Sequence, residues 1–318
     1  MSQTIDLRGE PLARAIEKKV IKEVMALSSK NVSPSIAVVV ASNLASAYSY
    51  AQLKQKADAL GIQLDVLDFQ QHATQQHLES VLDELSEDPN VHGIALDLPL
   101  SPNLDADRAL ARIAPNKDID GLTATNIGLV AAGREAEAIL AATPQACIEL
   151  AETQGSLKGK HVGVVGRGRT VGRPLIYMLL NRHATVTVCH TLTADIRKAL
   201  APCDVVIVAV GKPGVISGKH LAAGQLVIDA GINMVGDSLR GDVDTKSAMG
   251  KVAAISPVDG GVSPLASAII FRNLMTAIRF QQTGIGSLPK NPRQQTVTKS
   301  LNPLASGSTL ARSLRTGK

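Results

Sequence analysis

Three glycines within residues 162–174 have the spacing of a phosphate-binding turn. Gly166, Gly168 and Gly172 follow the apolar run at 162–165 and precede a second apolar run at 175–180. In a strand, turn and helix of this kind, the first glycine permits the turn and the second lets the backbone approach a pyrophosphate. The third lets the helix pack on the strand, and the N–H groups that begin the helix face the anion. The pattern predicts a dinucleotide site made of Gly166, Arg167, Gly168, Arg169, Val171 and Gly172.

The segment after this helix bears on the choice of nucleotide. Residues 185–190 are expected to form the next strand, which ends near the adenosine ribose. Proteins that bind NAD usually place Asp or Glu there, whereas this strand ends in His190 and Thr191, and Arg167 and Arg169 stand in the turn. We therefore expect NADP rather than NAD, although either arginine could instead face solvent.

A second group of candidate residues could handle a flat, polar substrate. Tyr50 and Lys54 are four residues apart, so on a helix they share a face. A tyrosine ring can support a heterocycle, and a lysine amine can transfer protons if its pKa is lowered. On their own, these two residues could equally be an ordinary surface pair.

Three aspartates lie near the end of a predicted strand or in a glycine-bounded loop. Asp97 ends the strand expected at 91–98, at the sheet edge where α/β proteins bind ligands. Asp118 and Asp120 lie in the loop 117–121, where carboxylates either organise a turn or accept hydrogen bonds from an amidine-like edge. His72, His77 and His92 have no spacing that requires a metal, so none is expected.

The elements that must position these residues alternate along the chain. Strands are expected at 35–41, 63–68 and 91–98, with helices over 5–28, 43–61, 75–85 and 104–113. After the glycine turn, apolar runs at 205–210, 227–229 and 252–255 complete a second parallel sheet, and 264–282 forms one long helix. The loop 257–264, PVDGGVSP, is either a domain connection or a ligand contact. The predicted fold class is therefore α/β with two domains.

Composition limits the kinds of partner. Residues 284–318 contain six basic residues and no acidic one. Their charge of +6 is larger than the net charge of the whole chain, +5, so the remaining chain is nearly neutral. We expect that tail to be disordered, and we expect no nucleic-acid partner. No apolar run approaches the length of a membrane span, and Cys147, Cys189 and Cys203 have no disulfide or metal spacing. These features predict a cytoplasmic protein without a membrane partner.

Several motifs together resemble one family, the bifunctional methylenetetrahydrofolate dehydrogenase/methenyltetrahydrofolate cyclohydrolases. The matching segments lie in the family's order and cover about residues 4–282: GIALDLPL (93–100), NKDIDGLTATNIG (116–128), ATP (142–144), VVGRGRTVGRP (164–174), VTVCHTLT (186–193), VAVGKPGVI (208–216), VIDAGIN (227–233) and PVDGGVSP (257–264).

The resemblance implies a homodimer that oxidises 5,10-methylenetetrahydrofolate with NADP and hydrolyses the methenyl product to 10-formyltetrahydrofolate. It implies a substrate domain over 1–142, completed by the helix at 264–282, and an inserted Rossmann-type domain, a doubly wound parallel sheet, over 143–263. The tail at 283–318 has no counterpart. Carried over motif by motif, Lys54, Tyr50, Asp97 and Asp120 are the candidate catalytic residues. Ile232 joins the cofactor-binding set, and the substrate-binding set is Tyr50, Leu98, Pro99, Asp120, Asp259, Gly260 and Gly261.

The folate side departs from the family pattern. The family's glutamine is Asp97, and the segment 257–266, PVDGGVSPLA, has Asp259, Ser263 and Ala266 in place of proline, glycine and threonine. One extra residue lies between Ser46 and Tyr50, and the helix is one residue short before Gly61, so without a gap Leu53 would take the lysine position. We prefer the gapped alignment because it keeps Tyr-x-x-x-Lys.

These departures leave three interpretations. In the first, the protein is a divergent folate enzyme. An Asp97 carboxylate beside the Lys54 amine would favour the protonated amine, a poor base, so hydrolysis would be weakened and Asp97→Gln would increase it. In the second, it is an oxidoreductase of the same fold with another small substrate. In the third, it binds nucleotide without catalysis.

Overall fold

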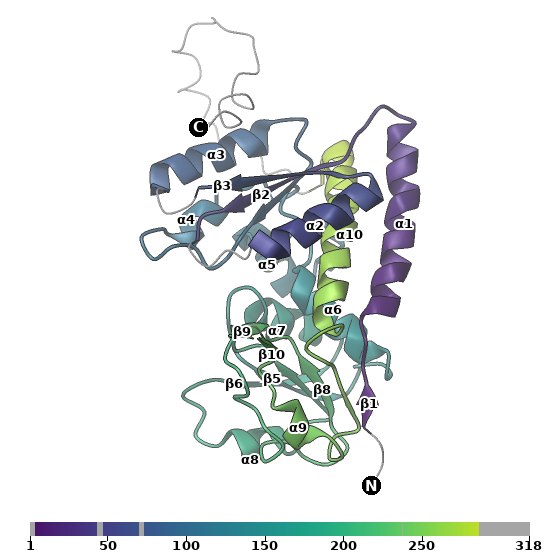
Figure 1. Ribbon diagram of the computed structural model, residues 1–318, viewed down its shortest axis with the longest axis vertical. Helices are drawn as coiled ribbons and strands as arrows, with labels where there is room; N and C mark the ends of the chain where they lie inside the picture. The colour runs from purple at the N-terminus through teal and green to yellow at the C-terminus, as the bar shows by residue number, and fades with distance from the viewer. Residues whose placement is uncertain (1–3, 43–46, 70–72, 237, 286–318) are drawn as a thin grey trace, which may run out of the picture. The chain divides into compact units, whose positions relative to one another are not determined.

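The computed structural model describes residues 4–42, 47–69, 73–236 and 238–285, with residues 47–50 described by their backbone alone. The described part of the chain contains two parallel sheets and a separate antiparallel hairpin (Figure 1). The predicted α/β class is confirmed. The disorder predicted for 283–318 falls almost wholly outside the described residues.

The first sheet has three parallel strands in the order β3-β2-β4. Its central strand is buried at every position, as expected for a strand with a parallel neighbour on each side and helices above and below. Its strands are β2 (Ser35–Val40), β3 (Gln63–Asp68) and β4 (Gly93–Leu96). The rest of the chain between β1 and β5 forms α1 (Glu10–Ser28), α2 (Ala47–Leu60), α3 (Gln75–Glu87), α4 (Ala106–Leu110), α5 (Ala124–Ala131), the 3-10 helix η2 (Glu135–Glu137) and α6 (Ala142–Glu152).

The second sheet has six parallel strands in the order β1-β11-β8-β7-β5-β6. β5 lies between β6 and β7, so the strand order reverses there, as it does in a Rossmann fold. The strands are β1 (Ile5–Asp6), β5 (His161–Val165), β6 (Thr185–Cys189), β7 (Val205–Val208), β8 (Leu226–Asp229) and β11 (Ala254–Ile255). The chain between them forms the helices α7 (Gly172–Asn181), α8 (Ile196–Leu200) and α9 (Thr245–Ala248), and the hairpin of β9 (Asn233–Val235) and β10 (Ser238–Arg240).

The last helix, α10 (Val262–Thr283), follows the six-stranded sheet and returns to the three-stranded one. It packs against α1 and α6, and Figure 1 shows α1 in purple beside α10 in yellow-green. Asn273 on α10 is buried and donates to the carbonyl of Ile119 at 2.8 Å, while Gln281 donates to that of Asn116 at 3.1 Å. These bonds fix the loop that carries Asp120.

Several short elements differ from the sequence-based expectation. The helix predicted over 5–28 begins only at Glu10, because residues 5–6 pair with β11, and Ile5 donates to the carbonyl of Ala253 at 2.9 Å. The hairpin β9–β10 was not predicted. Within the described ranges, no helix has the length and apolarity needed to cross a membrane.

Candidate functional site

A cavity of about 930 Å³ brings together segments from both sheets. It is lined by the turn after β5, by the loops after β7 and β8, and by the residues that follow β4. The starts of α1, α6 and α10, the middle of α2, the loop that carries Asp120 and the residue Asp242 also line it. Of the sequence-predicted site residues, those that line it are Asp97, Leu98, Asp120, Gly168, Val171, Ile232, Asp259 and Gly260.

The glycine turn has the geometry that its spacing predicts. Gly166 has a φ of 109°, and a Cβ there would lie 2.1 Å from the carbonyl oxygen of Ala209. A Cβ on Gly172 would lie 2.3 Å from the carbonyl oxygen of Gly166. The helix can therefore begin this close to the strand only because residue 172 has no side chain. At Gly168, by contrast, a Cβ would meet nothing within 4 Å. That open backbone at the start of α7 fits a dinucleotide pyrophosphate.

The two arginines of the turn have different surroundings. Arg167 is exposed, and no ion pair to it exists among the described residues. Arg169 forms an ion pair with Asp107 in the first turn of α4. The hydrogen bond to Arg169 lowers the pKa of the Asp107 carboxyl below its usual range. One arginine is therefore available to an anion, and the other is held by a carboxylate.

The end of β6 carries no acidic group. His190 donates its N–H to Thr193 Oγ1 at 2.8 Å, and its Nδ1 accepts from the N–H of Leu192 at 3.2 Å. His190 and Thr191 are not part of the cavity lining. Their contact with a cofactor stays a prediction.

The aspartates of the first sheet separate into a structural one and two that line the cavity. Asp118 is buried and accepts from the N–H of Thr123 at 2.8 Å and from Asn126 Nδ2 at 2.9 Å, so it organises the turn. Asp97 and Asp120 line the cavity instead. Burial, followed by the charges of Asp118 and Asp97, raises the pKa of Asp120 to about 7. Asp120 can therefore change charge near neutral pH.

The register of α2 does not favour Lys54 as a catalytic residue. Ala57 and Leu60 are buried, and Leu53 lies on the same stripe, four residues before Ala57, and lines the cavity. Lys54 is rotated by about 100° around the helix from Leu53. Its Nζ donates to the carbonyl of Leu64 on β3 at 3.2 Å, and it does not line the cavity.

This placement differs from the one that the gapped alignment predicts. Because the buried residues near the end of α2 set its rotation, Leu53 rather than Lys54 points to the cavity. Tyr50 belongs to α2, but its side chain lies outside the described residues. The role of Tyr50 in the site therefore stays a prediction. The structure does not bring Lys54 into the lining of the cavity.

The loop 257–264 lines the cavity through Asp259 and Gly260, as do Ser263 and Ala266 farther along. Gly261 precedes α10 and is not part of the lining, and neither is Pro99, which is exposed after β4. The loop therefore lines the cavity as well as connecting the two segments, and its contact with a ligand stays a prediction.

Comparison with known proteins agrees with this geometry. Residues 7–120 match the catalytic domain, and residues 141–282 the NAD(P)-binding domain, of tetrahydrofolate dehydrogenase/cyclohydrolase. The chain is 44% identical to the bifunctional protein FolD of Deinococcus radiodurans, over 88% of this chain and 95% of that protein. The chain belongs to the tetrahydrofolate dehydrogenase/cyclohydrolase family. This confirms the resemblance recognised in the sequence.

Solved structures of this family have the same fold. The methylenetetrahydrofolate dehydrogenase-cyclohydrolase of Trypanosoma brucei, complexed with NADP cofactor and inhibitor, has a TM-score of 0.83 and 32% identity, covering 89% of this chain and 99% of its own. The bifunctional enzyme FolD of Campylobacter jejuni has a TM-score of 0.82 and 30% identity, covering 87% and 99%.

The sequence analysis missed several residues that line the cavity of this family member. Glu10 follows Gly9, whose N–H donates to the carbonyl of Gly260 at 2.8 Å, so this contact brings the start of α1 to the site. Lys56 also lines the cavity, and its Nζ lies 3.9 Å from Glu17 Oε1. Asp242 is a further lining residue. Long-range pairing brings these residues together, and no local motif marks them.

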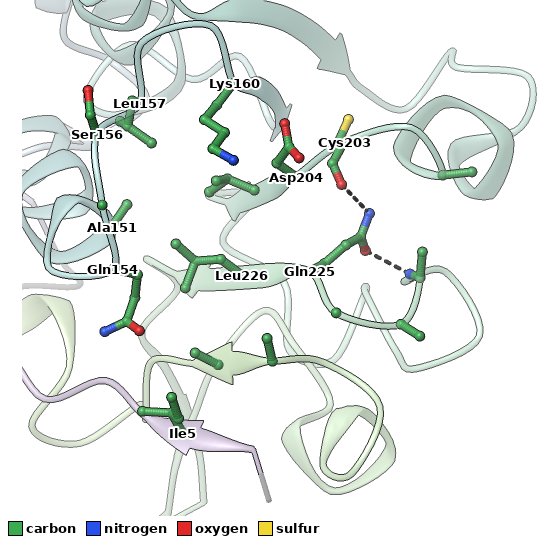
Figure 2. Close-up of a pocket in the computed structure, with 18 residues that line it drawn as sticks. Ile5, Ala151, Gln154, Ser156, Leu157, Lys160, Cys203, Asp204, Gln225 and Leu226 are labelled. Atoms are coloured by element: carbon green, nitrogen blue, oxygen red, sulfur yellow. Dashed lines mark hydrogen bonds between the residues drawn. The ribbon is translucent and has the colours of Figure 1, made fainter. Parts of the chain in front are cut away.

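A second cavity, of about 410 Å³, lies where the chain enters the strands of the six-stranded sheet (Figure 2). Its labelled polar side chains include Lys160, Asp204 and Gln225. Gln225 donates to the carbonyl of Cys203 at 2.9 Å and accepts from the N–H of Ala222 at 2.7 Å, so its amide is used in holding loops together. None of the sequence-predicted site residues lines this cavity. Among the described residues, no cluster of His, Cys, Asp or Glu could hold a metal ion.

Proposed function

We propose that this protein oxidises 5,10-methylenetetrahydrofolate to 5,10-methenyltetrahydrofolate with NADP. The observation that carries the proposal is the shared cavity, in which the glycine turn and the Asp120 loop line one space of about 930 Å³. A dinucleotide on the turn and a pterin on Asp120 would then lie in the same enclosure. Membership of the family supports the same conclusion.

The residues of the cavity contribute mainly binding and orientation. NADP, when bound, accepts a hydride from the one-carbon bridge. The open backbone at Gly168 and Val171 would hold its pyrophosphate, and an ionised Asp120 would accept hydrogen bonds from the amidine-like edge of the pterin. Because the pterin nitrogen itself expels the hydride, alignment of the two rings is the main task of the protein in this step.

Hydrolysis of the methenyl product is proposed to be slow in this protein. Leu53 lines the cavity where the family pattern expects a lysine, and Lys54 donates to Leu64 outside it. Among the described residues, the one amine in the cavity lining is that of Lys56, which lies within ion-pair distance of Glu17. An apolar side chain at position 53 cannot transfer the proton that hydrolysis requires.

The experiment that tests the proposal is a turnover assay with purified protein, 5,10-methylenetetrahydrofolate and either NADP or NAD. Reduced cofactor is followed by its absorbance, and acid quenching measures methenyltetrahydrofolate separately. We expect reduction of NADP in preference to NAD, with methenyl product accumulating. The absence of turnover with both cofactors, when NADP binds, would contradict the folate assignment.

A second candidate function is oxidation of another small substrate on the same fold. The observation that favours it is the charge of the cavity wall: among the described residues its lining has one lysine, Lys56, and five acidic residues, Glu10, Asp97, Asp120, Asp242 and Asp259. Such a wall attracts cationic groups and repels anionic ones. A nicotinamide-dependent activity that needs no folate would support this alternative, whereas NADP binding without any turnover would indicate a non-catalytic protein.

The proposal includes a homodimer in the cytoplasm. The hairpin β9–β10 and the residue before it expose four apolar side chains, Ile232, Met234, Val235 and Leu239, with 43% to 64% of each accessible. A second copy of the chain would cover them. The three buried free thiols support a reducing compartment.

A further inference from the structure

Asp242 is a buried carboxylate whose hydrogen bonds converge from two loops. Its side chain is fully buried and follows the hairpin β9–β10. Oδ2 accepts from the N–H of Val210 at 2.5 Å and from that of Gly211 at 2.8 Å. Oδ1 accepts from the N–H of Lys212 at 2.9 Å and from Asn233 Nδ2, also at 2.9 Å.

These four bonds connect the loop after β7 to the chain after β8. A second buried carboxylate, Asp229, accepts from the N–H of Asp242 at 3.1 Å and from that of Gly231 at 2.9 Å, and so fixes the backbone that carries Asp242. The fit is close, because a Cβ on Gly231 would lie 2.2 Å from Asp242 Cγ. The two aspartates thus determine the path of both loops.

Both loops line the cavity on one side of the glycine turn. Val210 and Gly211 come from the loop after β7, and Gly231 and Ile232 from the chain after β8. In a Rossmann sheet, a dinucleotide crosses the carboxyl ends of the strands at the point where the order reverses, here between β5 and β7. With the adenosine half towards β6, the nicotinamide half extends over β7 and β8.

We propose that Asp242 is a positioning residue for the nicotinamide half of the cofactor, acting by holding the loops after β7 and β8 in their binding shape. The inference rests on the proposed use of NADP. It also explains why a carboxylate is present. All four partners of Asp242 are N–H donors, and only an ionised carboxyl group accepts from all of them. An asparagine would turn its NH₂ group towards one pair of donors.

The test compares a whole ligand with a half ligand. Calorimetry on the full chain would measure binding of NADP and of adenosine 2′,5′-bisphosphate, which lacks the nicotinamide half. Asp242→Asn should raise the dissociation constant of NADP about tenfold, which corresponds to about one lost charge-assisted hydrogen bond. The dissociation constant of the half ligand should stay within about twofold of the wild-type value. Asp244→Asn is the matched control, since it removes the same charge from an exposed position two residues away and should change neither.

A second variant and a second measurement guard against a folding defect. Asn233→Ala keeps the carboxylate and removes one of its four donors, so NADP should weaken by about threefold. In the unliganded Asp242→Asn protein, the amides of residues 210–212 should exchange with solvent faster than in the wild type.

Equal weakening of both ligands, or no weakening of NADP, would overturn the inference. Equal weakening would mean that Asp242 supports the whole sheet rather than the nicotinamide side. Failure of the wild-type protein to bind NADP would overturn the cofactor assignment itself, and that result is obtained before any variant is made.

Discussion

Asp97 and Asp120 put two carboxylates on one wall of the cavity, and the second cannot be fully ionised at neutral pH. Burial is the largest cause of the raised pKa of Asp120, and the neighbouring charges of Asp118 and Asp97 add to it. Asp118 is committed to the turn through its hydrogen bonds. Asp97 lies outside this turn and lines the cavity, so its charge is the one to remove when the effect on Asp120 is tested.

The proposed pterin contact predicts a pH dependence. Because Asp120 has a raised pKa of about 7, it is protonated below that pH and loses its ability to accept two hydrogen bonds, so KM for the folate should rise as the pH falls. Asp97→Asn should move the midpoint of that profile about half a unit lower. The measurement is kcat/KM for the dehydrogenase step as a function of pH.

Asp259→Asn provides the control for this prediction. Asp259 lines the same cavity but is not among the charges that raise the pKa of Asp120. An equal shift in both variants, or none in Asp97→Asn, would show that the two carboxylates do not interact.

At the scale of elements, the rotation of α2 decides which side chain faces the substrate. Ala57 and Leu60 anchor the helix in the core, so Leu53 rather than Lys54 lines the cavity. A base could therefore be restored without changing the helix.

Leu53→Lys should increase hydrolysis of methenyltetrahydrofolate, because it brings an amine into the cavity. General acid–base catalysis typically contributes a factor of 10² or more, so we expect a gain of at least about tenfold, larger when combined with Asp97→Gln. Asp97→Gln alone should now gain less than about twofold, since Lys54 lies outside the cavity. The rate of hydrolysis is measured by the decay of methenyltetrahydrofolate absorbance at neutral pH.

Gln52→Lys is the matched control, because residue 52 also lines the cavity but lies one position away on the helix. A similar gain at both positions would indicate that any added positive charge is sufficient. No gain with Leu53→Lys would contradict the register argument.

A second element-scale feature is the ion pair between Arg169 of the glycine turn and Asp107 of α4. If Arg169 recognises the 2′-phosphate of NADP, Asp107 competes with that phosphate. Asp107→Asn should then lower the dissociation constant of NADP about threefold and leave that of NAD unchanged. A threefold change is within the range that an exposed ion pair contributes. Comparison of the two dissociation constants at low and high salt measures the effect, which should shrink as salt rises.

Asp83→Asn, which breaks an exposed pair with Arg112, is a suitable control. Tighter binding of both nucleotides in Asp107→Asn would argue that Asp107 restricts access to the turn rather than occupying the arginine.

For the whole molecule, the exposed hairpin predicts the state of assembly. Lysine at Met234 and Leu239 would place two charges in a surface that a second copy would bury, so the double variant should become monomeric. Sedimentation velocity gives the mass, and circular dichroism checks the fold. Leu192→Lys, at an apolar residue that is 80% exposed outside the hairpin, should keep the mass of the wild type. A monomeric wild type would remove the hairpin as a subunit interface.

The sequence indicated the parts of the fold that depend on local pattern. β2, β5 and β7 are short apolar runs, and the glycine turn has a spacing that only a few folds use. The sequence could not show β1, because a strand of two residues exists only through its pairing with β11, about 250 positions away. Nor could it show Asp242, because the acceptor role of a carboxylate leaves no periodicity. Nor could it show which side of α2 lines the cavity, because burial of Ala57 and Leu60 sets the rotation of the helix.

The pairing of β1 and the return of α10 also affect how the chain is made. The first strand of the chain ends up at the edge of the six-stranded sheet, and the core around the three-stranded sheet needs α10, the last described helix. During synthesis, the six-stranded sheet can acquire all its strands only after β11 at Ala254–Ile255, and the core around the three-stranded sheet only after α10, which ends at Thr283. A chain truncated after the three-stranded sheet would lack both α10 and the strands that pair beside β1. It would expose hydrophobic surface, which chaperones and proteases recognise.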